Sequence, residues 1–364
     1  MYTLYGSEVS LYTGKIRAYL RFKQLPFMEE LSTVKVYKDI ILPETKVAYI
    51  PVVKTPQGQY LQDTARIIDH LEAQHSERSI IPTAPTQHLV SELFALWGDD
   101  WLVIPAMHYR WNKNNFPFIY QEFGRVVAPK APGFIRAYFG KKLAKKFSGF
   151  VPVLGITPHS IPSIEAWYEK TVLHHLNVHF ATHQYLLGSR PCVGDFGLMG
   201  PLYAHLYRDP APGKLMREIA PNVAAWVERM NKPEVELGEF LPDDDIPKTL
   251  LPLIQNIFEE QWPVLRSTVS ALSEWREANP HEHFIPRSVG QHSFSINQVS
   301  ESRAISSFHQ YKLQRVLNTY QQFSASEKEN VSAFLASVKA DNYLQMTVKD
   351  KVIMEHNKLV FAQD

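Results

Sequence analysis

The spacing of apolar residues over positions 1–76 switches repeatedly between the periods of strands and helices. Positions 2–5 form a short apolar run that predicts a strand, and positions 15–23 carry apolar residues on one helical stripe between basic residues. Positions 50–62 predict two strands joined by a tight Pro-Gln-Gly turn. Positions 63–75 return to helical spacing. The pattern therefore predicts an α/β domain at the start of the chain.

After a proline-containing linker at positions 77–88, the pattern becomes helical. Apolar residues keep helical spacing up to about position 235, and no strand pattern is visible. A long helix is expected over about 162–187, and a kink is expected near Pro105 because an internal proline breaks the helical hydrogen-bond ladder. These features predict an all-helical second domain over 89–240.

A second proline-rich stretch at 241–252 separates the remainder of the chain. Helical spacing covers 250–279, and apolar and polar residues then alternate over 293–297, which indicates a short strand or hairpin. Helices are expected again from about 303 to 340, and the last apolar stretch closes the chain as a strand or a helix. We therefore expect residues 241–364 to form an appended, mostly helical module of unknown role.

Composition and charge exclude several classes of protein. A chain of 364 residues with 45% hydrophobic and 21% charged residues is typical of two or three globular domains. No apolar run approaches the roughly 18 residues of a membrane span, so an integral membrane protein is not expected. The net charge of +1 gives no general attraction to nucleic acid. Cys192 is the single cysteine, which favours a reducing compartment and predicts a cytoplasmic protein.

Two short motifs in the first domain allow both a structural and a functional interpretation. Ile50-Pro51-Val52 is either an ordinary trans-proline at a strand edge or a cis-proline. A cis-proline would leave the backbone N–H and C=O of Val52 free to pair with an extended peptide. Asp63-Thr64 either caps a helix or holds a ligand carboxylate on the first-turn amides, with Asp63 available to an ammonium group.

Two further motifs concern the ends of helices. A loop rich in hydroxyl groups over positions 7–13 leads into a basic amphipathic helix that is expected to begin near Gly14. Cys192 and Asp195 have the spacing of a capping box, which is a folding signal and carries no chemistry. The hydroxyl loop is therefore the one of the two that bears on function.

Three stretches together resemble a cytosolic glutathione transferase. They are LYGSEVSLYTGKIRAYLRFKQLPF at 4–27, YIPVVKTPQGQYLQDTARIIDHLE at 49–72 and LLGSRPCVGDFGL at 186–198. The family has a thioredoxin-like α/β N-terminal domain followed by an all-helical C-terminal domain, and the resemblance covers roughly residues 1–235. The last segment lies outside the usual length of the family and looks like an appended module.

The resemblance implies that a hydroxyl in the loop before the first helix contacts the sulfur of glutathione. Ser10 matches that position, and Tyr12 and Thr13 are the alternatives. The residue after Ser10 is Leu11, where many members of the family have proline.

For the rest of glutathione, the resemblance implies contacts with Ile50, cis-Pro51 and Val52, with Val52 pairing with the cysteinyl backbone. Asp63 and Thr64 match the pair that holds the γ-glutamyl end. Thr64 stands where serine is commoner, which keeps the hydroxyl and adds a methyl group.

Aromatic residues at helical spacing follow the linker. Trp97, Trp101 and Tyr109 are expected, as a group, to line an apolar pocket for the second substrate. The alternative is that they belong to the core, as single aromatic residues at such spacings more often do.

Two other patterns have a plain and a functional interpretation. His175, His179 and His183 share one helix face and could bind zinc, but neither a neighbouring acidic or cysteine ligand nor the resemblance supports it, so no metal is expected. The basic stretch at 140–147 is either a solvated face or a surface that binds anions or a membrane.

The sequence therefore predicts a glutathione transferase-like enzyme. Such an enzyme, with a role in detoxification, would activate the glutathione thiolate, as co-substrate, for attack on a small electrophilic apolar substrate. A homodimer is possible, and neither a nucleic acid nor an integral membrane association is expected. The alternative is a non-catalytic scaffold or binding protein with the same fold.

Overall fold

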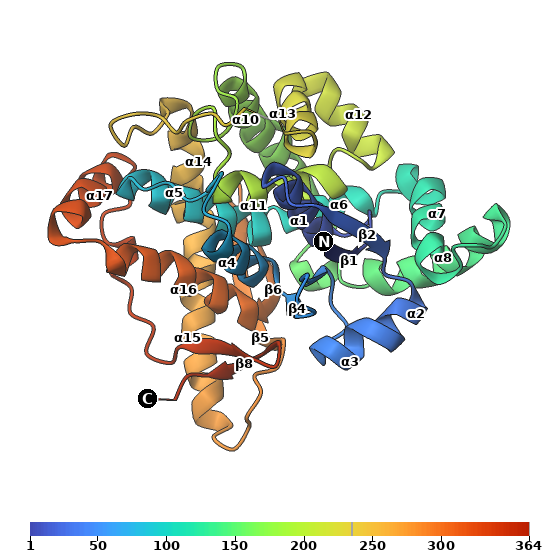
Figure 1. Cartoon of the computed structure of the whole chain (residues 1–364). Helices are drawn as coiled ribbons and strands as arrows, with labels where there is room; N and C mark the ends of the chain where they lie inside the picture. The colour runs from blue at the N-terminus through green and yellow to red at the C-terminus, as the bar shows by residue number, and fades with distance from the viewer. Residues whose placement is uncertain (234–235, 364) are drawn as a thin grey trace.

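The N-terminal segment is built on a four-stranded sheet with the order β2-β1-β3-β4 (Figure 1). β1 pairs in parallel with β2 and antiparallel with β3, and β3 pairs antiparallel with β4. The computed structural model describes residues 1–233 and 236–363. The elements of this segment are β1 (Tyr2–Gly6), α1 (Leu11–Phe22), β2 (Phe27–Leu31), α2 (Val34–Val36), the π-helical turn η1 (Tyr37–Ile41), α3 (Leu42–Thr45), β3 (Val52–Lys54), β4 (Tyr60–Gln62) and α4 (Thr64–Gln74).

The second segment is helical throughout its regular structure, as the sequence predicts. Its elements are α5 (Pro85–Leu96), the π-helical turn η2 (Trp97–Trp101), α6 (Val103–Arg110), η3 (Lys113–Asn115), α7 (Phe116–Val127), α8 (Gly133–Ser148), η4 (Pro152–Leu154), α9 (Ile161–Trp167), η5 (Tyr168–Leu173), α10 (His174–Phe180), α11 (Val193–Ala204), α12 (Pro210–Ile219) and α13 (Pro221–Asn231).

The glycine-rich helix α11 packs against α1 on one side and α5 on the other. The contact with the α5–η2 helix is made by backbone atoms. A Cβ added to Gly98 would lie 2.4 Å from the carbonyl carbon of Gly197, and one added to Gly197 would lie 2.5 Å from Cα of Ala95. Only glycine permits so close a crossing, which explains why this buried helix is rich in glycine.

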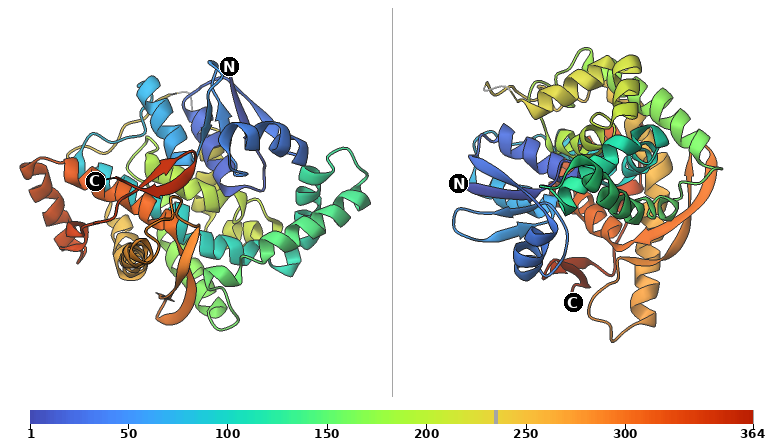
Figure 2. Two further views of the ribbon diagram at one scale, coloured as in Figure 1. Left: turned by 90° about the horizontal axis from the view of Figure 1, so that it is seen from below. Right: turned by 90° about the vertical axis from the view of Figure 1, so that its right-hand side faces the viewer.

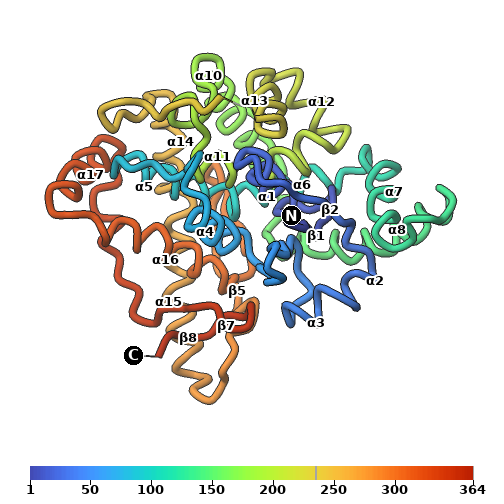
Figure 3. Tube along the Cα trace, in the orientation of Figure 1, coloured from blue at the N-terminus to red at the C-terminus, as the bar shows by residue number. Residues whose placement is uncertain are grey.

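The third segment combines helices with two β-hairpins, and Figure 3 shows its chain, in orange and red, running alongside α4 and α5. Its elements are η6 (Lys248–Leu250), α14 (Leu251–Asn256), the π-helical turn η7 (Ile257–Gln261), α15 (Trp262–Ala278), β5 (Ser288–Ile296), β6 (Val299–Ser306), α16 (Ser307–Gln322), α17 (Ala325–Ser337), η8 (Tyr343–Gln345), β7 (Val352–Glu355) and β8 (Lys358–Phe361).

One continuous cluster of buried apolar side chains runs through all three segments. It includes Leu4 of the sheet, Trp97 and Phe196 of the second segment, and Trp262 and Leu313 of the third. Because the third segment contributes to this shared core, it is packed into the molecule as part of the same body rather than attached to its surface.

Two features of the second segment differ from the sequence expectation. The helix expected over 162–187 ends at Phe180, because the chain turns there and the amide of Tyr185 bonds the carbonyl of Gly188 at 3.0 Å. Near the expected kink at Pro105, the helical hydrogen bonding changes earlier, in the π-helical turn η2. Pro105 itself lies in the first turn of α6, where its missing N–H costs no helical hydrogen bond.

In the third segment, the strand or hairpin expected at 293–297 is confirmed as part of the β5–β6 hairpin. The helix expected from about 303 begins only at Ser307, because residues up to Ser306 pair with β5. The last apolar stretch is the β7–β8 hairpin, which settles the open choice between strand and helix in favour of strands.

The predicted capping box of α11 is confirmed and extends into a buried hydrogen-bond centre. The carboxylate of Asp195 accepts bonds from the amide of Cys192 at 2.9 Å, the amide of Leu186 at 3.1 Å and the indole N–H of Trp226 at 3.1 Å. Asp195 is fully buried, so its carboxylate links three parts of the helical segment where water cannot replace it.

We predict that Asp195→Ala lowers the free energy of unfolding by at least about 3 kcal/mol, because it leaves three buried donors without an acceptor. Urea denaturation measures the change. Glu327→Ala is the matched control, since Glu327 is the corresponding residue of a capping box at an exposed helix end and accepts from the amide of Ser324 at 2.7 Å. The control should lose only about 1 kcal/mol, and equal losses in the two variants would contradict the prediction.

Candidate functional site

One end of the N-terminal sheet brings the predicted glutathione residues together. Tyr5 at the end of β1 pairs with Val52 at the start of β3, and Val52 pairs with Gln62 at the end of β4. Three features therefore lie at the same end of the sheet. They are the loop before α1, the peptide bond at Pro51 and the start of α4 at Asp63. Elements far apart in the sequence meet here because the register fixes their order.

Ser10 is the N-cap of α1, which begins three residues before the expected position at Gly14. Its Oγ accepts a hydrogen bond from the amide of Thr13 at 3.2 Å, and the residue is half-buried. The side chain of Thr13 is fully buried and accepts from the amide of Ser7 at 3.4 Å, so it braces the loop from inside. Of these two hydroxyls, that of Ser10 lies at the N-terminus of α1.

The loop that carries Ser10 is anchored from the helical segment. Val9 packs against the buried cluster of Ile119, Phe123 and Ala144 between α7 and α8. The guanidinium of Arg110, which is fully buried, donates to the carbonyl oxygen of Val9. The position of the loop thus depends on residues about one hundred positions away.

Tyr12, the main alternative to Ser10, is directed towards the helical segment. Its hydroxyl donates to the backbone carbonyl of Asp99 at 3.0 Å. The ammonium of Lys312 donates to the same carbonyl at 2.8 Å and lies 5.4 Å from the centroid of the Tyr12 ring. Burial raises the pKa of Tyr12. The proton of this hydroxyl is therefore already committed to a protein acceptor.

The Ile50–Pro51 peptide bond is cis. Of the two isomers that the sequence left open, this is the one on which the functional interpretation depends. The expectation that Val52 offers a free backbone edge is wrong. Val52 is fully buried and has a paired strand on either side, so no open edge exists there for a peptide. Ile50 lies outside the strands, and its backbone forms no hydrogen bond with any part of the chain that the structure describes.

At the start of α4, Asp63 has a left-handed backbone with φ of +77°, which is uncommon for a residue other than glycine. Its carboxylate accepts from the amides of Ala65 at 3.1 Å and Arg66 at 3.3 Å. Burial raises the pKa of Asp63, while the Arg66 amide and the nearby Lys312 act in the opposite direction. Thr64 follows as the first residue of the helix and is buried. Such backbone strain concentrates at functional sites.

The aromatic residues expected to line a second-substrate pocket are core residues. Trp97 and Trp101 have no exposed surface, and Tyr109 is 7% exposed. Trp97 packs edge-on against Trp167, and the hydroxyl of Tyr109 donates to Glu169 at 2.5 Å. The expectation was wrong because helical spacing identifies a buried stripe without showing whether the stripe faces a cavity or another helix.

The third segment covers the end of the sheet. Besides the contact of Lys312 with Asp99, the guanidinium of Arg66 donates to the side chain of Asn357 at 2.9 Å. The side-chain amide of Asn357 in turn donates to the backbone carbonyl of Thr45 at 2.8 Å. The β7–β8 hairpin and α16 therefore lie across the edge from which the loop before α1 and the start of α4 emerge.

A buried cluster of charges fixes the third segment in this position. Asp100 lies 2.7 Å from His309 and 3.3 Å from Arg303, and the neighbouring Asp99 lies 2.6 Å from Lys15 of α1. Burial raises the pKa of Asp100, but His309 and Arg303 outweigh it and hold the pKa well below its usual range. The sequence analysis missed this cluster, although two adjacent aspartates inside an otherwise apolar helix are a signal that buried cations must lie opposite.

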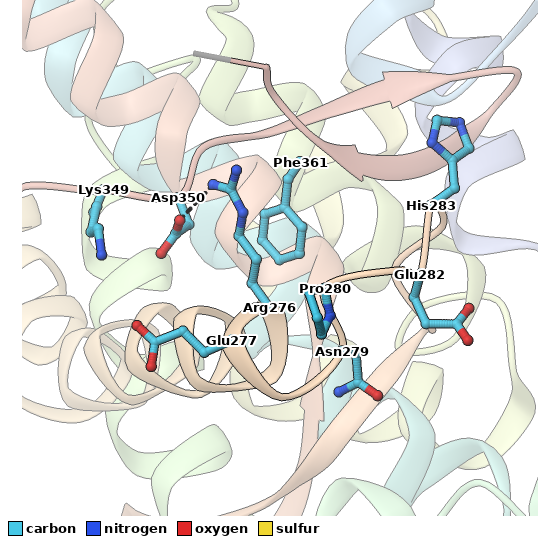
Figure 4. A pocket seen from close by; sticks show the side chains of 9 residues that line it. All are labelled: Arg276, Glu277, Asn279, Pro280, Glu282, His283, Lys349, Asp350 and Phe361. Atoms are coloured by element: carbon cyan, nitrogen blue, oxygen red, sulfur yellow. Dashed lines mark hydrogen bonds and ion pairs between the residues drawn. The ribbon is translucent and has the colours of Figure 1, made fainter.

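Figure 4 shows an open pocket elsewhere, between the end of α15 and the β7–β8 hairpin. Its cavity volume is about 570 Å³, and Arg276 and Asp350 in its wall pair at 2.6 Å. A second pocket of about 640 Å³ lies by the end of α1. Neither of these two pockets is lined by Ser10, Pro51 or Asp63.

The sequence model described as "Glutathione S-transferase, N-terminal domain" matches residues 4–79. The model described as "Glutathione S-transferase, C-terminal domain" matches residues 160–234. No curated protein matches the chain. The predicted order of a thioredoxin-like domain and an all-helical domain is thus confirmed, and the third segment lies outside both matches.

Similar solved structures include glutathione S-transferases from two bacteria and from rice. The one from Rhodospirillum rubrum F11 is 16% identical, with 68% of this chain and 97% of that chain covered and a TM-score of 0.42. The one from Methylobacterium radiotolerans, a complex with glutathione sulfonate, is 16% identical, with 66% and 98% covered and a TM-score of 0.38. Rice GST1, in complex with glutathione, is 18% identical, with 64% and 88% covered and a TM-score of 0.38.

We predict that Asp100→Ala lowers the free energy of unfolding by about 3–5 kcal/mol, because the buried guanidinium of Arg303 loses its counter-charge and the ring of His309 loses its hydrogen-bond partner. Urea denaturation followed by tryptophan fluorescence measures the loss. Glu218→Ala is the control, since it removes an exposed pair with Lys214 at 3.7 Å and should change stability by less than about 1 kcal/mol. A loss for Asp100→Ala as small as the control's would contradict a stabilising role for the cluster.

Proposed function

We propose that this chain, which belongs to the glutathione S-transferase family, binds glutathione at the covered end of its N-terminal sheet and activates its thiol for attack on a small electrophilic apolar molecule. One observation carries the proposal. Three features meet at one end of the N-terminal sheet. They are the N-cap Ser10, the cis peptide bond at Pro51 and the positive-φ backbone of Asp63, which precedes Thr64. A tripeptide with a thiol and an amino-acid head group needs these three kinds of contact.

The sulfur is assigned to Ser10. The cap bond to Thr13 uses a lone pair of the serine oxygen, so the hydroxyl proton stays available to donate to a thiolate. Lowering a thiol pKa by two units, from about 8.5, requires roughly 2.7 kcal/mol. A hydrogen bond to a charged group supplies about 1.5–3 kcal/mol, and a helix N-terminus adds about 0.3–1 kcal/mol. The geometry of Ser10 at the start of α1 therefore matches the task in magnitude.

The two ends of the peptide are assigned to the other two features. The γ-glutamyl carboxylate goes to the amide and the hydroxyl of Thr64 at the start of α4, and its ammonium goes to Asp63. The backbone of Ile50, beside the cis bond at Pro51, replaces Val52 as the group that pairs with the cysteinyl residue. This change follows from the position of Val52 inside the sheet.

The proposal places the reaction in the cytoplasm with glutathione as co-substrate and without a metal. The role in detoxification, the electrophile and a homodimer stay predictions from the resemblance. The scaffold alternative has no separate observation in its favour.

We predict that glutathione binds the full chain and that Thr64→Val weakens binding by about tenfold, because the hydroxyl is lost while the volume is kept. Isothermal titration calorimetry measures both affinities. Thr268→Val is the matched control, since that buried hydroxyl donates to Val264 at 2.9 Å on a helix outside the site. The absence of binding to the unchanged chain would contradict the proposal, and equal weakening in both variants would remove Thr64 from the site.

We also predict that Ser10→Ala lowers turnover of an activated aryl chloride by about tenfold or more while glutathione affinity changes little, because the hydrogen bond acts on the thiolate. The pH dependence of turnover should move upward with the thiol pKa. Ser324→Ala is the control, since Ser324 caps α17 through the same kind of bond, from the Glu327 amide at 3.3 Å, at an exposed site. Unchanged turnover in Ser10→Ala would contradict the assignment of the sulfur to Ser10.

A further inference from the structure

The helices α7 and α8 form a hairpin that projects from the body at the side opposite the third segment (Figures 1 and 2). The two helices are in backbone contact. A Cβ on Gly140 would lie 1.8 Å from the carbonyl oxygen of Tyr120, and one on Gly124 would lie 2.2 Å from that of Arg136. The inner faces enclose their own apolar cluster of Ile119, Phe123 and Ala144. The outer face of α8 therefore needs no further partner for the hairpin to hold together.

That outer face is nevertheless apolar over its first half. Phe134 is 77% exposed, Tyr138 is 58% exposed and Phe139 is 40% exposed. Single exposed apolar residues are normal on protein surfaces, whereas a contiguous group of three rings on one helix face indicates a surface that becomes covered.

The second half of the same face is basic. Lys141 and Lys145 continue the stripe of Phe134 and Tyr138 at helical spacing, and Lys142 lies beside it with its ammonium 4.5 Å from the Tyr138 ring. Lys146 adds a fourth exposed charge. Among the residues that the structure describes, none of these four lysines forms an ion pair with an acidic side chain.

The charge is concentrated in this part of the chain. Residues 123–164 contain seven lysines and arginines and no aspartate or glutamate. Because the whole chain has a net charge of +1, the other residues together carry −6. The hairpin is thus a basic surface on an otherwise acidic protein, and it favours a partner with dense negative charge.

We propose that the outer face of α8 docks on a membrane surface that carries anionic lipids. The rings of Phe134, Tyr138 and Phe139 enter the boundary between head groups and acyl chains, and the lysines contact the phosphates. Rings and cations side by side on one helix face match this boundary, where apolar and anionic chemistry meet in one plane. A nucleic acid duplex would use the charges but would leave the phenylalanines in water, because its bases are already stacked on one another.

The helix lies on the membrane and does not cross it. α8 has 16 residues, fewer than the roughly 20 that a spanning helix needs. None of the helices in the described part of the chain is long and apolar enough to cross a membrane.

Flotation of the full chain with lipid vesicles tests the proposal. We expect the chain to float with vesicles of equal parts phosphatidylcholine and phosphatidylglycerol and to stay behind with phosphatidylcholine alone, with binding that falls as salt rises. Charge reversal of the four lysines, K141E/K142E/K145E/K146E, should weaken binding by about a hundredfold or more. The control K248E/K339E/K349E/K351E makes the same change of net charge at exposed lysines of the third segment and should bind as the unchanged chain does.

A second variant separates insertion from charge. F134S/Y138S/F139S keeps every lysine and removes rings that are already exposed, so it should fold normally and still lose about tenfold or more in vesicle binding. Circular dichroism and glutathione titration of each variant check that the rest of the molecule is intact.

No flotation with the anionic vesicles, equal loss in the control, or binding of an RNA oligonucleotide abolished by the same substitutions would overturn the proposal. A concentration-dependent dimer in light scattering that F134S/Y138S/F139S abolishes would assign the face to a second copy of the chain and overturn it as well.

Discussion

The buried aspartate pair in η2, directly after α5, is the constraint on which the arrangement of the three segments depends. Asp99 meets Lys15 of the N-terminal segment, and Asp100 meets Arg303 and His309 of the third segment. Charges removed from water are tolerated only when they are paired. The helical segment can therefore bury Asp99 and Asp100 only when the N-terminal segment supplies Lys15 and the third segment supplies Arg303. This requirement joins the three segments into one folding unit.

The features that sequence reasoning located are local ones. These features are the loop hydroxyl of Ser10, the proline at position 51 and the pair of Asp63 and Thr64. Each acts within a few residues of itself, so its sequence context is enough to find it. Their meeting at one site was implied by the resemblance to glutathione transferases and not by the pattern of any single stretch. The exact roles did not follow, since the pairing of Val52 on both sides is a property of the assembled sheet.

What the sequence could not provide depends on distant partners. Lys312 and Asp99 are separated by more than two hundred positions, so the adjacent aspartates signal a buried cation without showing which residue supplies it. Trp97 and Trp101 show the same limit, because their spacing defines a buried stripe without naming what covers it. The third segment supplies part of that cover, since Phe294 of β5 packs edge-on against Trp101 and the guanidinium of Arg303 lies 5.4 Å from the centroid of the Trp101 ring.

The packing of Val9 under the helical hairpin has a consequence for where an electrophile would come from. Val9 precedes Ser10 directly and contacts the cluster that joins α7 to α8. Under both proposals, a hairpin resting on a bilayer would tie the loop of Ser10, the residue proposed to face the sulfur, to a membrane-bound element. Apolar molecules partition from water into hydrocarbon. The concentration that matters for such a loop would be the one dissolved in the membrane, and the hairpin would determine from which phase the proposed site draws its electrophile.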